Sequence, residues 1–170
     1  MNSGQSFLSL GAMTLVALII LQVNTGFVMT SSTLLDNKLT ILAVSLASSV
    51  IEEASGKSFD ANTIADAVSN TTDLTYPGSL GPNSSESYPN FNDFDDFNNL
   101  EFTSTALSSA EFNIRTKVCY VQTNNPDIVS SIPTWHKKIT VYVTSNSLVN
   151  AEGVQDTVEM SSVFSYWHFR

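Results

Sequence analysis

The chain has 170 residues, a formal net charge of −9 at pH 7 and only seven Lys and Arg residues. Nucleic-acid binding needs basic side chains clustered against the phosphates, so this charge balance argues against nucleic acid as a partner. The single cysteine, Cys119, excludes an intrachain disulfide, and we expect it to be an ordinary strand residue.

The chain begins with a long predicted helix, residues 1–57, which has no proline and no charged residue before Asp36. Residues 5–23 form an apolar run of about nineteen residues, roughly enough to cross a bilayer core. Apolar residues then recur at the spacing of one helix face, at Leu35, Leu39, Leu42, Leu46 and Val50. A helix of roughly fifty residues is about 75–80 Å long. A small domain cannot cover that length, so something outside the chain must bury the helix.

Three interpretations of such a helix can be compared: a secretory signal, a transmembrane anchor and the core of a filament. A secretory signal would need a basic region at its start, and residues 1–7 have none. A plain transmembrane anchor would leave the amphipathic half as a long stalk, and its orientation would depend on a weak basic bias, because the first basic residue is Lys38. The third is a helix that leaves the membrane and packs against copies of itself in a filament core.

The apolar part of the helix is interrupted by the polar stretch Asn24, Thr25 and Gly26. This stretch predicts a helix break, either a hinge or a locally melted turn. The alternative is a tolerated glycine, which costs about 1 kcal/mol relative to Ala.

Residues 58–99 connect the helix to the rest of the chain. We expect Asp60 to cap a short helix at residues 61–68, with Ile64, Ala67 and Val68 facing inward. Residues 69–99 read as a long loop rich in Asn, Ser, Asp, Pro and Gly. Five aromatic residues should pin this loop to an apolar surface while its acids face out: Tyr76, Tyr88, Phe91, Phe94 and Phe97. Two sequons, at Asn70 and Asn83, offer acceptor sites for N-glycosylation.

Residues 100–170 predict an antiparallel sheet of about four strands, because alternating apolar residues recur without an intervening helix. The expected strands are 100–105, 111–122, 137–144 and 156–169, with connections at 124–135 and 145–155. One face of this sheet needs covering, and the amphipathic half of the helix is the large apolar surface available. The predicted fold is therefore α+β: a long N-terminal helix, residues 1–57, packs on the sheet of an acidic head, residues 58–170.

This order of features resembles that of type IV pilins and type II secretion pseudopilins. Residues 91–97, FNDFDDF, resemble the acidic stretch that precedes the sheet in prepilin-like proteins, and ITVYVTSNS and DTVEMSSVFSYW resemble their last two strands. The resemblance implies a subunit that is inserted in a membrane and then polymerises with its own copies into an extracellular filament on the cell surface. The implied assembly surface consists of Gly4, Gln5, Phe7, Leu10, Gly11, Leu15, Leu18 and Leu21.

The N-terminus departs from the pattern of that family, which has a leader cut after Gly and a Glu at mature position five. Either Gly4 is the cleavage-site glycine and Gln5 the first mature residue, or Met1 is retained and Gln5 stands at the position of the Glu. Neither version supplies a carboxylate. We therefore expect subunit registration through the polar residues Asn2, Ser3 and Gln5.

A calcium site is the candidate cofactor site of the acidic loop. Asn92, Asp93, Asp95 and Asp96 carry oxygen ligands of the kind that Ca²⁺ takes, and some pseudopilins hold calcium in such a loop. The spacing is not that of an EF-hand. The alternative is a solvated acidic loop with aromatic anchors.

Catalysis finds no support in the sequence. There is no Gly-rich phosphate loop and no G-x-S-x-G motif. His136 and His168 lack companion ligands at metal-binding spacing, and neither stands beside a plausible nucleophile. We therefore predict a structural filament subunit and not an enzyme. The alternative is a membrane-anchored minor pseudopilin or surface binding module that forms no major filament.

Overall fold

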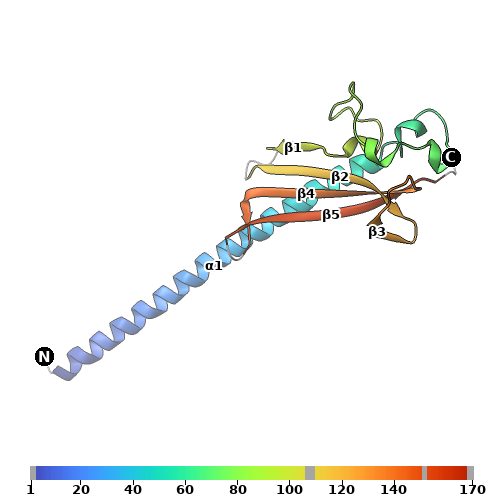
Figure 1. The fold of residues 1–170 in the computed structure, drawn as a ribbon. Coiled ribbons are helices and arrows are strands. Elements are labelled where there is room, and N and C mark those ends of the chain that lie inside the picture. The colour runs from blue at the N-terminus through green and yellow to red at the C-terminus, as the bar shows by residue number, and fades with distance from the viewer. Residues whose placement is uncertain (1–2, 106–109, 151–152, 168–170) are drawn as a thin grey trace. The chain divides into compact units, whose positions relative to one another are not determined.

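The computed structural model describes residues 3–105, 110–150 and 153–167, and its architecture is α+β (Figure 1). One long helix, α1 (Ser3–Ser55), precedes the sheet, and residues from Leu39 onward pack on it, which confirms the predicted fold class. The internal contacts divide the chain into two units, Met1–Lys38 and Leu39–Arg170. This boundary falls earlier than residue 57 because residues 39–55 of α1 belong to the core of the second unit.

Helix α1 is continuous from Ser3 to Ser55 and includes Asn24, Thr25 and Gly26. It ends at Gly56, whose N–H donates to the carbonyl of Glu52 at 3.1 Å. The break predicted at residues 24–26 is therefore absent from the isolated chain. A melted turn at this place inside a filament stays a prediction.

The sheet is antiparallel, with the order β1-β2-β4-β5, and β3 pairs with β2. Its strands are β1 (Glu101–Ser104), β2 (Phe112–Gln122), β3 (Asn125–Val129), β4 (His136–Val149) and β5 (Gln155–Ser165). The alternation expected in β2 is present, because Phe112 and Ile114 are buried while Asn113 and Arg115 are exposed. Cys119 lies on β2, as predicted.

Two expectations about the connections were wrong. Residues 124–135 contain the strand β3, which is exposed throughout and holds Pro126. Proline is tolerated there because β3 pairs only at its β2 side. Strand β4 continues past Thr144 to Val149, with a register shift between these two residues that lets Leu148 turn inward. The sequence did not indicate this extension, because Ser145, Asn146 and Ser147 are typical of turns.

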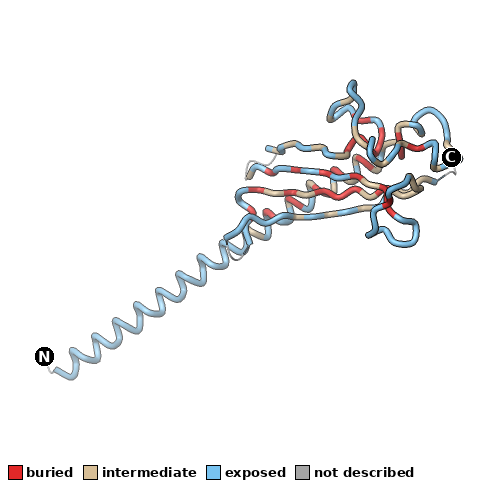
Figure 2. The backbone as a smooth tube through the Cα atoms, viewed as in Figure 1, coloured by how far each residue is buried: buried red, intermediate tan, exposed pale blue. Residues whose placement is uncertain are grey.

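The main core lies between the second half of α1 and one face of the sheet, and Figure 2 shows the buried residues concentrated there. The helix residues that are fully buried are Leu39, Ala43, Ala47, Val50 and Ala54. The predicted apolar stripe was therefore rotated: Leu42 and Leu46 are only partly buried, and Leu35 is exposed. Alanines occupy the centre because their short side chains allow the helix backbone to approach the sheet closely.

Residues 58–99 contain four short 3₁₀ helices: η1 (Ala61–Thr63), η2 (Thr71–Asp73), η3 (Pro77–Ser79) and η4 (Asp95–Phe97). Asp60 caps η1 as predicted, but the helix expected over residues 61–68 ends after one turn. Isolated segments of this length are marginal as helices. Ile64 and Ala67 are consequently exposed, and only Val68 packs on a core cluster.

The aromatic residues of the loop behave largely as predicted. Phe91, Phe94 and Phe97 are buried in the main core, and Tyr88 packs against it. Tyr76 is the exception, because its side chain is 65% exposed. The expectation that the acids of this loop face solvent was wrong for its last part, in which all three carboxylates are buried: Asp93, Asp95 and Asp96.

Candidate functional site

The first unit presents a continuous apolar helix surface, residues 3–35. Its large apolar side chains are exposed in the isolated chain, from 52% for Ile19 to 78% for Leu8 (Figure 2). Helix α1 is long and apolar enough to cross a membrane by length and composition. An exposed apolar surface of this extent is unfavourable in water, so it marks a place where membrane or protein contacts form.

Helix geometry brings most of the predicted assembly residues together. Residues three, four or seven positions apart lie on the same side of a helix. Five of the predicted assembly residues therefore form one stripe: Gly4, Phe7, Gly11, Leu15 and Leu18. Measured from the middle of this stripe, Leu21 and Leu10 lie about 85° and 105° around the helix on one side, and Gln5 lies about 115° around it on the other side. A Cβ atom added at Gly4 or Gly11 would meet nothing within 4 Å. The fold of the isolated chain therefore does not require glycine at either position.

Hydroxyl side chains within the apolar segment bond to the backbone of their own helix. Thr14 Oγ1 donates to the Gly11 carbonyl at 2.8 Å, and Thr25 Oγ1 donates to the Leu21 carbonyl at 2.8 Å. Ser9, Thr30 and Thr33 make equivalent bonds. A donor satisfied in this way loses little when water is removed, so these residues are compatible with an apolar environment.

The buried acids of the head surround a buried lysine. The Lys137 ammonium donates to Asp60 Oδ2 and Asp95 Oδ1, each at 2.7 Å, and to the Phe59 carbonyl at 2.8 Å. Its side chain is 0% exposed. Burying a charge is costly unless it is paired and hydrogen-bonded, and here all three ammonium hydrogens have acceptors. This cluster joins η1, η4 and the start of β4.

Asp60 is the most connected member of this cluster. Besides Lys137, it accepts hydrogen bonds from Asn62 N and Thr75 N, each at 3.1 Å, and from the Tyr120 hydroxyl at 3.0 Å. Burial alone would raise the pKa of Asp60, but Lys137 and these hydrogen bonds lower it below its usual value. Burial and the Asp60 charge raise the pKa of Tyr120, which therefore stays a neutral donor.

Sequence reasoning missed Lys137, although a signal was present. Apolar residues alternate along this strand at Ile139, Val141 and Val143, and Lys137 follows the same period of two. A lysine in register with three core residues predicts a buried charge that needs an acidic partner. Its partners, Asp60 and Asp95, lie 77 and 42 residues away, so no local pattern indicates them.

Two carboxylates of the predicted calcium site hold each other's backbone. Asp93 Oδ1 accepts from Asp96 N at 3.2 Å, and Asp96 Oδ2 accepts from Asp93 N at 3.3 Å. The remaining oxygens, Asp93 Oδ2 and Asp96 Oδ1, are buried without a hydrogen-bond partner among the described residues. Such oxygens are suitable ligand atoms for Ca²⁺.

Other features of the site do not favour calcium. Among the described residues, no group of three His, Cys, Asp or Glu side chains is arranged to hold a metal ion. The Asp95 carboxylate binds Lys137, and the Asn92 amide donates to Glu86 Oε1 at 2.7 Å. The four predicted ligands therefore lie in one segment but do not converge on one position, and calcium binding stays a prediction.

We expect the stability of the head to fall as the pH rises from about 5 to 8. Burial and the Asp95 charge raise the pKa of Asp93 to about 8, so the folded chain keeps a proton that the unfolded chain has lost. The resulting stabilisation is complete below about pH 4 and is lost as the pH passes 8. Its slope is at most about 1.4 kcal/mol per pH unit. Urea unfolding of the full chain in detergent at several pH values measures it.

The variant Asp93→Asn should flatten this profile, since an amide keeps the acceptor oxygen without the charge. Asp73→Asn, an exposed acid on η2, is the matched control and should leave the slope unchanged. A slope that persists in Asp93→Asn would contradict the assignment. Adding Ca²⁺ tests the alternative role, because a bound cation would stabilise the wild type most at high pH.

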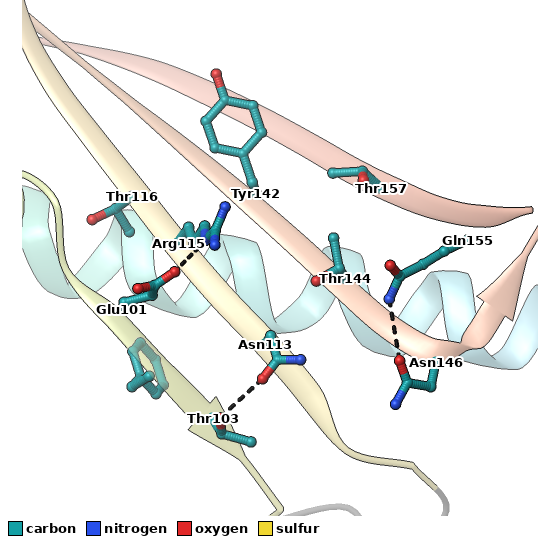
Figure 3. A pocket seen from close by; sticks show the side chains of 11 residues that line it. Glu101, Thr103, Asn113, Arg115, Thr116, Tyr142, Thr144, Asn146, Gln155 and Thr157 are labelled. Atoms are coloured by element: carbon teal, nitrogen blue, oxygen red, sulfur yellow. Dashed lines mark hydrogen bonds and ion pairs between the residues drawn. The ribbon is translucent and has the colours of Figure 1, made fainter.

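The face of the sheet opposite the core is hollowed and polar (Figure 3). The hollow has a volume of about 990 Å³ and is lined from β1, β2, β4 and β5. Cross-strand pairs cover it: Glu101 with Arg115, and Thr103 Oγ1 with Asn113 Oδ1 at 2.9 Å. Such cross-strand pairs of polar side chains are typical of a solvated sheet face.

The remaining predicted residues are separate from these features. Asn70 and Asn83 are both exposed, as glycosylation would require. His136 opens β4, and its Nδ1 lies 2.7 Å from Ser165 Oγ, a neighbour that the sequence did not indicate. Among the described residues, no carboxylate orients this imidazole as a catalytic triad requires. His168 lies outside the described residues, as does Asn2.

Comparison of the chain with protein-family models, with curated proteins and with solved structures found no significant match.

Proposed function

We propose that this chain is a structural subunit that polymerises through its apolar N-terminal helix into a helical filament on the cell surface, and that it has no catalytic role. The observation that carries the proposal is the charge-free apolar surface of residues 3–35, which nothing in the isolated chain covers. Full burial of each large apolar side chain contributes about 1.5–3 kcal/mol. Packing against copies of the same helix would bury this surface without a second kind of protein.

The two glycines of the stripe support close packing between helices. Glycine inside a helix costs about 1 kcal/mol relative to Ala, and Gly4 and Gly11 have no compensating contact within the chain. Small residues at membrane helix interfaces let the backbones approach each other. Before assembly the helix would reside in a membrane. In the filament the same surface would pack against other subunits and gain hydrophobic stabilisation at about 25 cal/mol per Å².

Registration between subunits would use neutral polar groups. Without an acid before Asp36, no carboxylate is available to neutralise a neighbour's amino terminus. Ser3 and Gln5 provide uncharged donors and acceptors at the start of the helix. An amide buried between helices sets register by hydrogen bonding, at a lower desolvation cost than a charge.

A second candidate is a membrane-anchored monomer, either a minor pseudopilin or a surface binding module. The length and composition of α1 are compatible with a simple anchor. The abundance of the chain in material sheared from cells separates the two roles, since a major subunit is plentiful there and a minor one is scarce.

The experiment that tests the proposal is cryo-EM of filaments sheared from the cell surface, at a resolution that shows side chains. Filaments with residues 3–35 in their core would support it, and the first ordered residue would show whether the chain is cleaved after Gly4. If the chain stays in membranes as a monomer and is found in no filament, the proposal is wrong.

A further inference from the structure

A cavity of about 400 Å³ lies where β4 begins and β5 ends. Its walls are aromatic: Trp135 precedes β4, and Tyr166 and Trp167 follow β5. This volume falls in the range of about 300–1,000 Å³ that is usual for small-molecule sites. Neither the membrane segment nor the buried ion cluster uses this cavity.

Two of the aromatic walls, Trp135 and Tyr166, are held in place before any ligand arrives. Trp135 and Tyr166 are stacked, with ring centroids 5.3 Å apart and planes 20° apart. The Tyr166 N–H donates to the Trp135 carbonyl at 2.9 Å, and the Tyr166 hydroxyl accepts from Val68 N at 3.1 Å. Trp167 is 75% exposed and carries a large apolar surface toward solvent. Because the Trp135 and Tyr166 rings are already held in place, little conformational entropy is lost when a ligand stacks on them.

A neutral polar pair completes the lining. His136 and Ser165 are register partners on β4 and β5, and their Nδ1 and Oγ atoms are 2.7 Å apart. Imidazole and hydroxyl groups both donate and accept hydrogen bonds. Among the described residues that line the cavity, none is Asp, Glu, Lys or Arg.

This combination selects for a particular ligand chemistry. A pyranose ring has a flat face of C–H groups, which stack on the electron-rich face of an aromatic ring, and a rim of hydroxyls that hydrogen-bond to neutral polar groups. A nucleotide would also stack, but its phosphates need basic side chains, and the described residues of the lining include none. A carboxylated or sulfated ligand fails for the same reason.

We infer that the cavity between Trp135, Tyr166 and Trp167 binds a neutral sugar ring, stacked on the aromatic side chains and hydrogen-bonded by His136 and Ser165. The site belongs to the second unit and does not depend on polymerisation. A monomer would have it as well as a filament.

Tryptophan fluorescence should report binding at this site directly, because the only two tryptophans of the sequence both line the cavity. We would titrate the full chain with maltotriose, cellotriose and N,N′,N″-triacetylchitotriose and follow tryptophan fluorescence. The detergent should be a polyoxyethylene ether, since a maltoside headgroup is itself a sugar. Choline is added as a separate probe, because aromatic cages also bind quaternary ammonium groups.

Saturable quenching or a spectral shift with at least one oligosaccharide is expected. Trp167→Ala should weaken the apparent affinity at least tenfold, with Trp135 remaining as the reporter. Trp167 is largely exposed, so its removal should leave the fold intact. Tyr76→Ala, an exposed aromatic outside the cavity, is the matched control and should bind like the wild type.

Four results would overturn the inference. One is the absence of saturable binding by all three sugars. The second is equal binding by Trp167→Ala and the wild type, which would place any sugar site elsewhere. The third is a response to choline alone, which would identify the cavity as a cation cage. A fluorescence change that depends on protein concentration and not on sugar would show that a second copy of the chain fills the cavity, and it would overturn the inference too.

Discussion

Replacing Lys137 with Met should destabilise the folded chain by about 3–5 kcal/mol, which is the usual cost of removing one partner from a buried ion pair. Met has a similar length and fills the same volume, so packing changes little. The loss comes from Asp60 and Asp95, whose carboxylates each bond the ammonium at 2.7 Å. Without it, both would be buried charges with no counter-ion. Urea unfolding of the full chain in detergent, followed by tryptophan fluorescence, measures the change.

The neighbouring lysine is the matched control for this variant. Lys138 points to the other face of β4 and forms a looser ion pair with Asp127, at 3.7 Å, whose side chain is 92% exposed. Exposed pairs contribute at most about 1 kcal/mol, so Lys138→Met should stay within that range. Equal stability of the two variants would contradict the role given to Lys137.

The pH dependence separates lost charge compensation from lost packing. In Lys137→Met, acidification removes the uncompensated negative charge of the buried carboxylates, so the deficit should shrink as the pH falls. Adding Asp60→Asn and Asp95→Asn to Lys137→Met should restore part of the stability at neutral pH. If the deficit is independent of pH, the cause is packing and not charge.

The helix and most strands were predictable because their signals are local. A period of two identified β2 and β4, and a high content of Val and aromatic residues identified β5. The absence of proline together with helical spacing identified α1. The centre of the helix interface was less predictable, since alanine carries a weak hydrophobic signal. Ala43 and Ala47 are fully buried because the sheet approaches them, and only the tertiary structure shows this.

The buried ion cluster could not be predicted from local patterns. Asp95 and Asp96 lie in a loop with the composition of a solvated surface, and Lys137 alone among its partners stands in a core register. The chain buries these acids because η4 is anchored by Phe94 and Phe97 on either side. The His136–Ser165 contact joins residues 29 positions apart and depends on strand register.

The proposed assembly surface rests on composition and helical geometry alone. The stripe with Gly4, Gly11 and Leu18 follows from the helix period alone. The helix period does not predict which surface packs against this stripe, because that surface would lie on another copy of the chain. A variant that blocks close approach without adding charge therefore tests it most directly.

Replacing Gly11 with Leu should abolish filaments and leave the chain in the membrane. A Cβ atom added at Gly11 meets nothing within 4 Å, and leucine is a better helix former than glycine, so the helix itself should stay intact and become more apolar. Between two helices, however, it would fill the space that glycine leaves for a close backbone approach. We expect at least a tenfold drop of the chain in sheared material, measured by immunoblot against the membrane fraction.

Two further variants distinguish the causes of such a loss. Val16→Leu adds bulk about 140° around the helix from Gly11 and should assemble normally. Leu15→Glu places a charge in the apolar stripe, which costs about 2.5–3.5 kcal/mol at the centre of a membrane helix, so it should reduce insertion as well as assembly. Only a loss of filaments with normal insertion in Gly11→Leu shows that helices pack through this stripe. Wild-type amounts of filament in Gly11→Leu would show that the glycine faces no neighbour, and the assembly surface would then lie on another side of α1.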